Sequence, residues 1–100
     1  MLKVTVLYGH PSDAASFEKY YAETHLPLAA KTKEIVKTEF TTFSSNPDGS
    51  LPAYYRMAEL YFENAGLMQQ AFASVEGKAM AADLANFASG GATIIFGTIN

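Results

Sequence analysis

The segment Ala53–Phe62, with the sequence AYYRMAELYF, limits the possible folds most, because it is apolar on two opposite sides. Successive residues of a β-strand point to opposite faces of a sheet. On this spacing one side carries Tyr54, Ala58, Leu60 and Phe62, and the other carries Tyr55, Met57 and Tyr61. A strand that is buried on both sides belongs in the middle of a sheet. The chain is therefore expected to build a sheet around this segment.

Other segments supply the neighbouring strands and the helices that cover them. Runs rich in β-branched and aromatic residues predict three further strands, over Leu2–Tyr8, Glu34–Ser44 and Ala92–Ile99. Apolar residues at helical spacing predict helices over Phe17–His25, over Ala65–Ser74 and around the stripe of Met80, Leu84 and Phe87. With right-handed crossovers, this order predicts the α+β class: a ferredoxin-like βαββαβ domain, with a four-stranded antiparallel sheet and helices on one face.

Local signals mark the ends of several elements. Ser12 or Asp13 can cap the first helix and Asn64 the second, because their side chains accept hydrogen bonds from free backbone amides. The run Asn46–Gly49, Asn-Pro-Asp-Gly, matches a type I turn with proline second and glycine last. We therefore expect a hairpin connection between the two middle strands of the chain.

The first helix combines an aromatic stripe with a histidine near its end. Phe17 and Tyr21 fall on one stripe at helical spacing, and His25 flanks it. Pro27 removes a backbone donor and clashes with the preceding turn, and a residue before proline favours extended geometry. The helix is therefore expected to end close to His25, with Leu26 extended. Pro27 is then expected to open a short second turn through Ala30, because proline is tolerated at the first helical position.

Composition bounds the class of protein. One hundred residues make a single domain, residues 1–100. A net charge of −3 with only seven Lys and Arg gives no footprint for nucleic acid. Without cysteine, and with two histidines far apart in sequence, no metal site is expected. No signal segment is visible, and no apolar run approaches the roughly 20 residues of a membrane span, so we expect a cytoplasmic protein with no membrane partner.

The predicted helices cover only one face of the predicted sheet. Tyr55, Met57 and Tyr61 would then project from the bare face of a monomer. Soluble monomers seldom expose so large an apolar patch. A homodimer through the open sheet face would cover it.

Several motifs resemble those of one known family. They are VLY followed by Gly9-His10-Pro11, the run from Phe17 through Tyr21 and His25 to Leu28, the stretch Glu59-Leu60-Tyr61-Phe62, and Glu76-Gly77 with Asp83 and Phe87 before a glycine-rich turn. Over nearly its whole length the chain resembles the EthD family, small dimeric α+β-barrel proteins linked to ethyl tert-butyl ether degradation. The resemblance implies a barrel of two facing sheets, a cleft between the first helix and the sheet, and an association with oxidoreductases by context.

A pocket between the first helix and the sheet is the candidate site. Its expected lining is Tyr8, Tyr21, His25, Leu28, Phe40, Glu59 and Tyr61. Aromatic walls of this kind suit a small hydrophobic or aromatic ligand. His25 and Tyr21 are the candidate catalytic residues, because imidazole transfers protons near neutral pH and a tyrosine one turn away can hydrogen-bond to it.

Each candidate also has a structural interpretation. His25 can satisfy the free carbonyls of a helix end. Glu59 can pair with a base such as Lys3 or Arg56 rather than serve a site. Asp83 is expected to cap or form a salt bridge at the helix surface.

Three classes of function remain open from the sequence. The protein can be an enzyme in which His25 assists proton transfer on an enolisable or phenolic ligand, in isomerisation, cyclisation or cofactor-free oxidation. It can be a non-catalytic carrier or accessory dimer for a partner oxidoreductase, or a purely structural dimer. No cofactor is expected, although haem is a rival occupant, because dimeric α+β barrels include haem enzymes and His25 could be an axial ligand.

Overall fold

The computed structural model describes all residues, 1–100. In chain order the elements are β1 (Leu2–Tyr8), α1 (Ala14–Tyr20), the π-helical turn η1 (Tyr21–His25), α2 (Leu26–Ala29), β2 (Lys37–Thr42), β3 (Arg56–Phe62), α3 (Ala65–Ala73), α4 (Val75–Phe87) and β4 (Ala92–Thr98). Strands β2 and β3 are shorter than the predicted segments, while the order of elements is the predicted one.

The four strands form one antiparallel sheet in the order β2-β3-β1-β4. Strand β3 therefore lies between β2 and β1, which confirms the interior position predicted from its two apolar sides. In the register, Ala58 faces Val6 of β1 on one side and Phe40 of β2 on the other. This is the ferredoxin-like arrangement predicted from the sequence.

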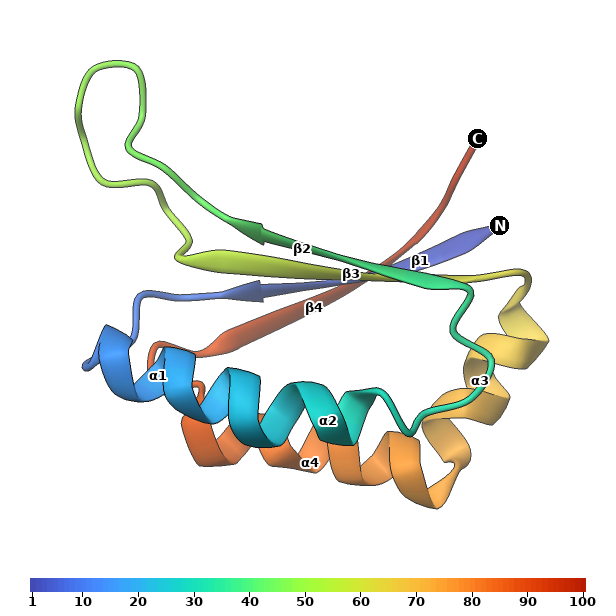
Figure 1. Ribbon diagram of the computed structural model, residues 1–100. Coiled ribbons are helices and arrows are strands. Elements are labelled where there is room, and N and C mark those ends of the chain that lie inside the picture. Colours follow the sequence, from blue (N-terminus) through green and yellow to red (C-terminus); the bar gives the residue numbers. More distant parts are fainter.

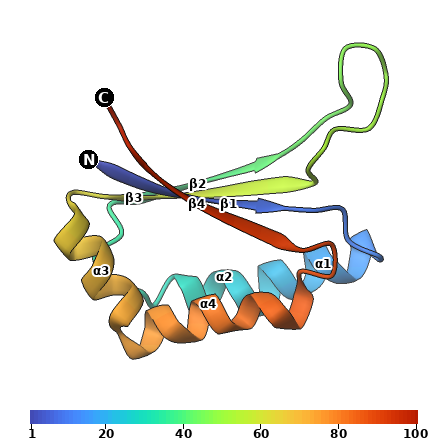
Figure 2. The same cartoon turned by 180° about the vertical axis from the view of Figure 1, so that it is seen from behind.

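The helices cover one face of this sheet and leave the other open. Figure 1 shows α1, η1 and α2 as one nearly continuous helical segment beside α4 beneath the sheet, and Figure 2 shows the same layers from behind. The core lies between the two layers. Its buried residues are Val4, Val6, Tyr8, Phe17, Tyr21, Ala58, Leu60, Phe62, Ala71, Met80 and Phe87. None of the helices has the length and apolarity needed to span a membrane.

The predicted caps and turn are present. The Asp13 carboxylate accepts a hydrogen bond from the backbone N–H of Ser16 at 3.2 Å, and the Asn64 side chain accepts one from Leu67 at 2.9 Å. In the loop between β2 and β3, the Gly49 N–H donates to the Asn46 carbonyl at 2.8 Å, which closes the turn.

The first helical segment does not end at His25, contrary to the prediction. Leu26 is helical, with φ −63° and ψ −41°, and its N–H donates to the carbonyl of Tyr21 five residues earlier. This wider π turn makes room for the ring of Pro27, which would otherwise clash with the preceding turn of an α-helix. Pro27 then occupies the first turn of α2, where its missing N–H costs little.

The open face of the sheet is less apolar than predicted. Glu59 lies there with Met57 and Tyr61, and it forms an ion pair with Lys3 at 2.8 Å. Tyr55 does not share this face, because it precedes β3 and its ring packs on Phe17 of the core, 5.2 Å between centroids. The open face thus combines apolar side chains with polar groups that already have partners.

Candidate functional site

A histidine and an aspartate meet in the interior, where η1 packs on α4. The Nδ1 atom of His25 lies 2.9 Å from Oδ2 of Asp83, and the two residues are 5% and 7% exposed. Of the two neutral tautomers of the imidazole, an aspartate at this distance favours the one with the proton on Nδ1. That tautomer has a lone pair on Nε2. No hydrogen bond in the structure involves Nε2. The pair therefore presents one basic nitrogen whose orientation is fixed.

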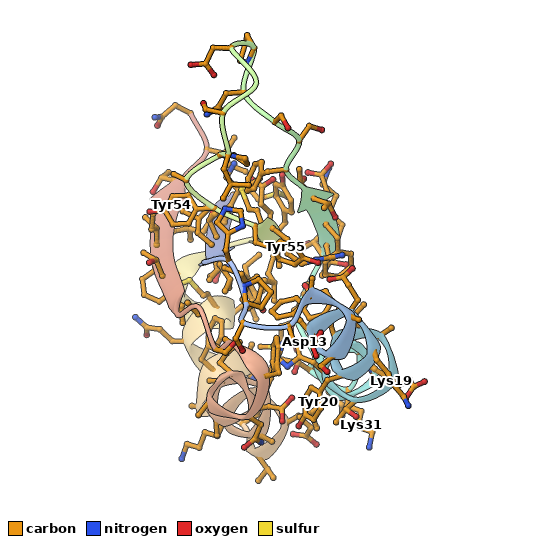
Figure 3. The ribbon with its side chains drawn as sticks, turned by 90° about the vertical axis from the view of Figure 1, so that its left-hand side faces the viewer. Asp13, Lys19, Tyr20, Lys31, Tyr54 and Tyr55 are labelled. Carbon is orange, nitrogen blue, oxygen red and sulfur yellow. The ribbon has the colours of Figure 1, made fainter.

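The Asp83 carboxylate is held by two further donors. The Tyr20 hydroxyl donates to its Oδ1 at 2.6 Å, and the Asn86 amide donates to the same oxygen at 2.9 Å. Figure 3 shows Tyr20 in the gap between the two helical segments, whereas Lys19 and Lys31 point away from it. Burial raises the pKa of Asp83, but the hydrogen bonds from Tyr20, Asn86 and His25 outweigh it and hold that pKa below its usual value. The carboxylate thus stays charged next to the imidazole.

His25 lines an apolar cavity between the helices and the covered face of the sheet. The cavity has a volume of about 50 Å³. Its walls come from all four strands and from η1, α2, α3 and α4, and they are Val4, Val6, Tyr8, Tyr21, His25, Leu26, Ala29, Thr38, Phe40, Ala58, Leu60, Phe72, Met80, Ala81, Leu84 and Ile94. Polar atoms are few on these walls. We call this space the inner cavity.

A wider groove adjoins the inner cavity between α2 and β2. It has a volume of about 300 Å³. Four residues line both spaces, Leu26, Ala29, Thr38 and Phe40. Phe40 is 47% exposed, and its ring stands edge-on to Tyr21 at 6.3 Å. The groove, which we call the outer groove, is therefore separated from the inner cavity in part by Phe40.

Two tyrosines line the inner cavity together with His25. The ring of Tyr21 stacks on that of His25, with 5.6 Å between centroids and an 18° angle, and the Tyr8 ring meets Tyr21 edge-on at 5.6 Å. Burial raises the pKa of both phenols, most strongly that of Tyr8. Both hydroxyls are therefore protonated near neutral pH and can donate hydrogen bonds.

The structure brings four of the seven proposed lining residues together. Tyr8, Tyr21, His25 and Phe40 line the inner cavity. Leu28 does not, because the uninterrupted helix turns Leu26 and Ala29 towards the sheet in its place.

Glu59 and Tyr61 lie on the opposite side of the sheet. They alternate with Ala58 and Leu60, which are buried under the helices, so the period of two directs them to the open face. There Glu59 pairs with Lys3, and the Tyr61 hydroxyl donates to the Glu39 carboxylate. The structural interpretation of Glu59 as an ion-pair partner fits this placement.

Asp83 is the site residue that the sequence reasoning missed. It is buried, whereas we expected it at the helix surface. A signal was present, since Asp83 lies three residues after Met80 and four before Phe87. That spacing puts it on the apolar stripe of α4, where a carboxylate needs partners.

Comparison with known proteins gives the family. An EthD domain profile matches residues 10–91. An uncharacterized 11.0 kDa protein in the thcB-thcC intergenic region of Rhodococcus erythropolis is 45% identical over 96 residues, which cover 96% of this chain and 92% of that protein. The crystal structure of an EthD family protein from Bacillus halodurans C-125 has a TM-score of 0.93 at 32% identity, over 100% of this chain and 99% of that one. The hydroxynitrile lyase of Passiflora edulis shares the fold, with a TM-score of 0.77 at 11% identity over 99% and 94% of the two chains. The profile match and the 32% identity to the Bacillus EthD family protein show that the chain belongs to the EthD family.

Proposed function

We propose that the protein binds a small, largely apolar ligand between its helices and its sheet, and that His25 exchanges a proton with it. One observation carries this proposal: a buried imidazole, held by Asp83 through Nδ1, lines a cavity whose other walls are almost all apolar. A basic nitrogen in such a cavity meets its ligand without competition from water. An imidazole with only a packing role would not need a free nitrogen there.

The proton transfer balances without a further reagent. For a ligand with an acidic hydrogen beside a carbonyl group, the lone pair of Nε2 takes the proton. The C–H bond breaks, its electron pair forms a C=C bond to the carbonyl carbon, and the C=O π pair moves to the oxygen, which becomes an enolate oxygen. The resulting imidazolium keeps its Nδ1–H on the Asp83 carboxylate, which stabilises the new positive charge. Return of the proton to the same carbon gives exchange, and return to another carbon gives isomerisation.

The size of the site limits the ligand. The inner cavity, at about 50 Å³, has room for a reacting group only, while the outer groove, at about 300 Å³, can hold the rest of a small ligand. We propose that haem is not the ligand, because the inner cavity of about 50 Å³ and the outer groove of about 300 Å³ are small beside the roughly 300–1,000 Å³ of pockets that hold drug-sized ligands. We therefore propose chemistry without a bound cofactor. The visible absorption spectrum of the purified protein, in the Soret region, checks this point.

A carrier function uses the same cavity without proton transfer. The apolar walls favour it, since they bind by contact area and need no reactive group. The Passiflora protein is a hydroxynitrile lyase, so an enzyme can be built on this fold, but its low identity carries no reaction over to this chain. Turnover, and not binding, separates the two functions.

We also propose that two copies pair through the open faces of their sheets. Leu7 of β1, Met57 of β3 and Ile95 of β4 project from that face, and Ile95 is 50% exposed. Of the charged side chains there, Lys3 pairs with Glu59, the Glu39 carboxylate accepts a hydrogen bond from Tyr61, and Lys37 lies over the Tyr61 ring. A second copy could therefore cover the face without burying an unpartnered charge.

Hydrogen exchange tests the proton transfer on a ligand of unknown identity. Small cyclic ketones, aryl ketones and lactones are incubated with the protein in D₂O, and loss of the α-proton signal is followed by NMR. A thermal-shift screen of the same compounds reports binding. We expect faster exchange with at least one compound class, and a loss of about 10²- to 10⁴-fold in His25→Gln, the usual contribution of general acid–base catalysis.

The second histidine of the chain provides a matched control. His10 lies outside the cavity, where its Nε2 is 2.7 Å from the Pro52 carbonyl oxygen, so His10→Gln should leave the exchange rate unchanged. Binding without exchange by the wild type would favour the carrier. If His25→Gln exchanges as fast as wild type, the proposed role of His25 is wrong.

A further inference from the structure

All three buried polar side-chain atoms that lack a hydrogen bond belong to one cluster. They are the Tyr21 hydroxyl, Nε of Arg56 and Oε2 of Glu18. The Arg56 side chain, which is 13% exposed, contacts both Glu18 and Tyr21. Its Nη2 donates to Oε1 of Glu18 at 2.6 Å, and its guanidinium carbon sits 4.6 Å from the centre of the Tyr21 ring. Buried polar groups are rarely left without partners, and Nε of Arg56 and Oε2 of Glu18 belong to one ion pair, so the Tyr21 hydroxyl is the group that lacks a partner.

Tyr21 connects this cluster with the inner cavity. It is 2% exposed, it lines the cavity, and its ring stacks on that of His25. Arg56 does not line the cavity and reaches it only through the ring of Tyr21. The ring of Tyr21 therefore contacts both the Arg56 guanidinium and the imidazole that we propose takes a proton from the ligand.

We propose that the Tyr21 hydroxyl hydrogen-bonds the ligand oxygen that becomes negative, and that Arg56 is a positioning residue that strengthens this bond through the Tyr21 ring. The inference rests on the proposed function and names its ligand class: phenols and enolisable ketones, in preference to ethers and hydrocarbons of the same shape. For a phenol, the O–H bond breaks, the proton goes to Nε2 of His25 and the electron pair stays on the oxygen. The phenolate then accepts the hydrogen bond of Tyr21.

The charges around the site agree with this assignment. After the transfer, the positive imidazolium lies between the negative oxygen and the Asp83 carboxylate. Arg56 adds a fixed positive charge on the other side of Tyr21, and a hydrogen bond to an anion is stronger than one between neutral groups. Burial raises the pKa of Tyr21, although the Arg56 charge opposes this, so the phenol keeps its proton and can donate it in a hydrogen bond. An ether has no proton to give and leaves Nε2 without a partner.

Two coloured probes test the inference in the intact protein. One is 4-nitrophenol, whose phenolate has its own absorption band, and the other is its methyl ether, 4-nitroanisole. Titrations are made below the pKa of free nitrophenol, where the free probe is the neutral phenol. The charged and titratable groups near the site are the same in both titrations, so they do not account for a difference between the two probes. They are Tyr8 of β1, Tyr21 of η1, Asp83 of α4 and Arg56 of β3. We expect the bound nitrophenol to show the phenolate band and to bind more tightly than the ether.

The variants separate recognition from packing. Tyr21→Phe keeps the ring and should weaken nitrophenolate binding by about 10- to 100-fold, the range for a hydrogen bond to a charged group, with little effect on the ether. Tyr54→Phe is the control for Tyr21→Phe, because Tyr54 lines neither the inner cavity nor the outer groove. Arg56→Met should give a smaller loss that Arg56→Lys restores, which a purely structural role would not produce.

Each of the alternative results would contradict a specific part of the proposal. If both probes bind with the same affinity and Tyr21→Phe changes neither affinity, the assigned role of Tyr21 is wrong. Slower deuterium exchange in His25→Gln than in the wild type would still support the proposed function. A nitrophenolate band that depends on Tyr21, together with no exchange in any ketone, would instead overturn the proposed proton transfer from carbon to His25. Failure of nitrophenol to bind up to its solubility would overturn the ligand class.

Discussion

The Nδ1 atom of His25 and Oδ2 of Asp83 lie 2.9 Å apart in the interior, although 58 residues separate them in the chain. This contact joins the π turn of the first helical segment to the last helix. It occupies Nδ1 and leaves Nε2 without a hydrogen bond. The stability of the fold and the chemistry of the site therefore depend on the same pair.

Asp83→Asn should lower stability in a way that depends on pH. Because the pKa of Asp83 is lower in the folded protein than in the unfolded chain, its carboxylate stabilises the fold above about pH 4, the ordinary range of aspartate, and this contribution is lost as the pH falls through the folded value. At neutral pH we expect a loss of about 1.5–3 kcal/mol in urea unfolding, because hydrogen bonds to a buried charge are removed. Glu23→Gln, at an exposed carboxylate without a hydrogen bond, is the control. A gap between wild type and Asp83→Asn that stays the same from neutral pH to strongly acid pH would speak against a charged Asp83 in the fold.

Gly77→Ala should be among the most damaging small substitutions. Gly77 is buried where α4 leaves α3, and an added Cβ would lie 2.0 Å from the Ala71 carbonyl oxygen. Backbone cannot yield as a side chain can, so the helices must separate, at a cost of about 1–3 kcal/mol or more. Gly97→Ala in β4 meets nothing within 4 Å and serves as the control. Equal melting temperatures for the two variants would show that the α3–α4 corner is not packed this way.

Phe40→Ala should widen the access to the inner cavity. The ring is 47% exposed and lines both the inner cavity and the outer groove, so its removal joins the two spaces at a modest cost of about 1–2 kcal/mol. In a series of 4-alkylphenols, measured by calorimetry, we expect the longer members to gain affinity over phenol itself. Phe96→Ala, at an exposed ring of β4 that lines neither space, should leave the ranking as in wild type. The same shift in both variants would remove Phe40 from the access route.

Met57→Lys should break a dimer formed through the open sheet faces. A charge on that face, opposite Leu7 in the register, would be buried without a partner in the dimer. We expect light scattering to give twice the 10.8 kDa chain mass for the wild type and the single-chain mass for the variant. Val75→Lys, on the helical side and 81% exposed, should remain dimeric. A wild-type mass of one chain at micromolar concentration would refute the proposed assembly.

The fold was predictable because its signals are local. The alternation in Ala53–Phe62 and the caps at Asp13 and Asn64 each depend on a few neighbouring residues, and the structure retains all three. The π turn before Pro27 was not predictable by the same rules. Those rules describe a proline in a regular α-helix, which ends or kinks there. In this chain the helix continues through a wider π turn.

The site was harder to predict, because its partners come from distant segments. His25 and Tyr21 follow from the apolar stripe of one helix, but the contact of His25 with Asp83 joins two elements whose packing no local pattern describes. A general expectation that carboxylates are exposed led to the wrong location for Asp83. Glu59 was placed in the pocket because a strand pattern shows which residues share a face but not which face the helices cover.

The most direct test of the central claim is the tautomer of His25, read from a long-range ¹H–¹⁵N NMR spectrum at about pH 8, where unperturbed histidine is neutral. His25→Gln identifies the signals, and His10 is the internal reference. We expect the proton on Nδ1, donated to Asp83, and an unprotonated Nε2 available to a ligand. A His25 ring that carries its proton on Nε2 would contradict the account, because the nitrogen facing the cavity could then accept no proton.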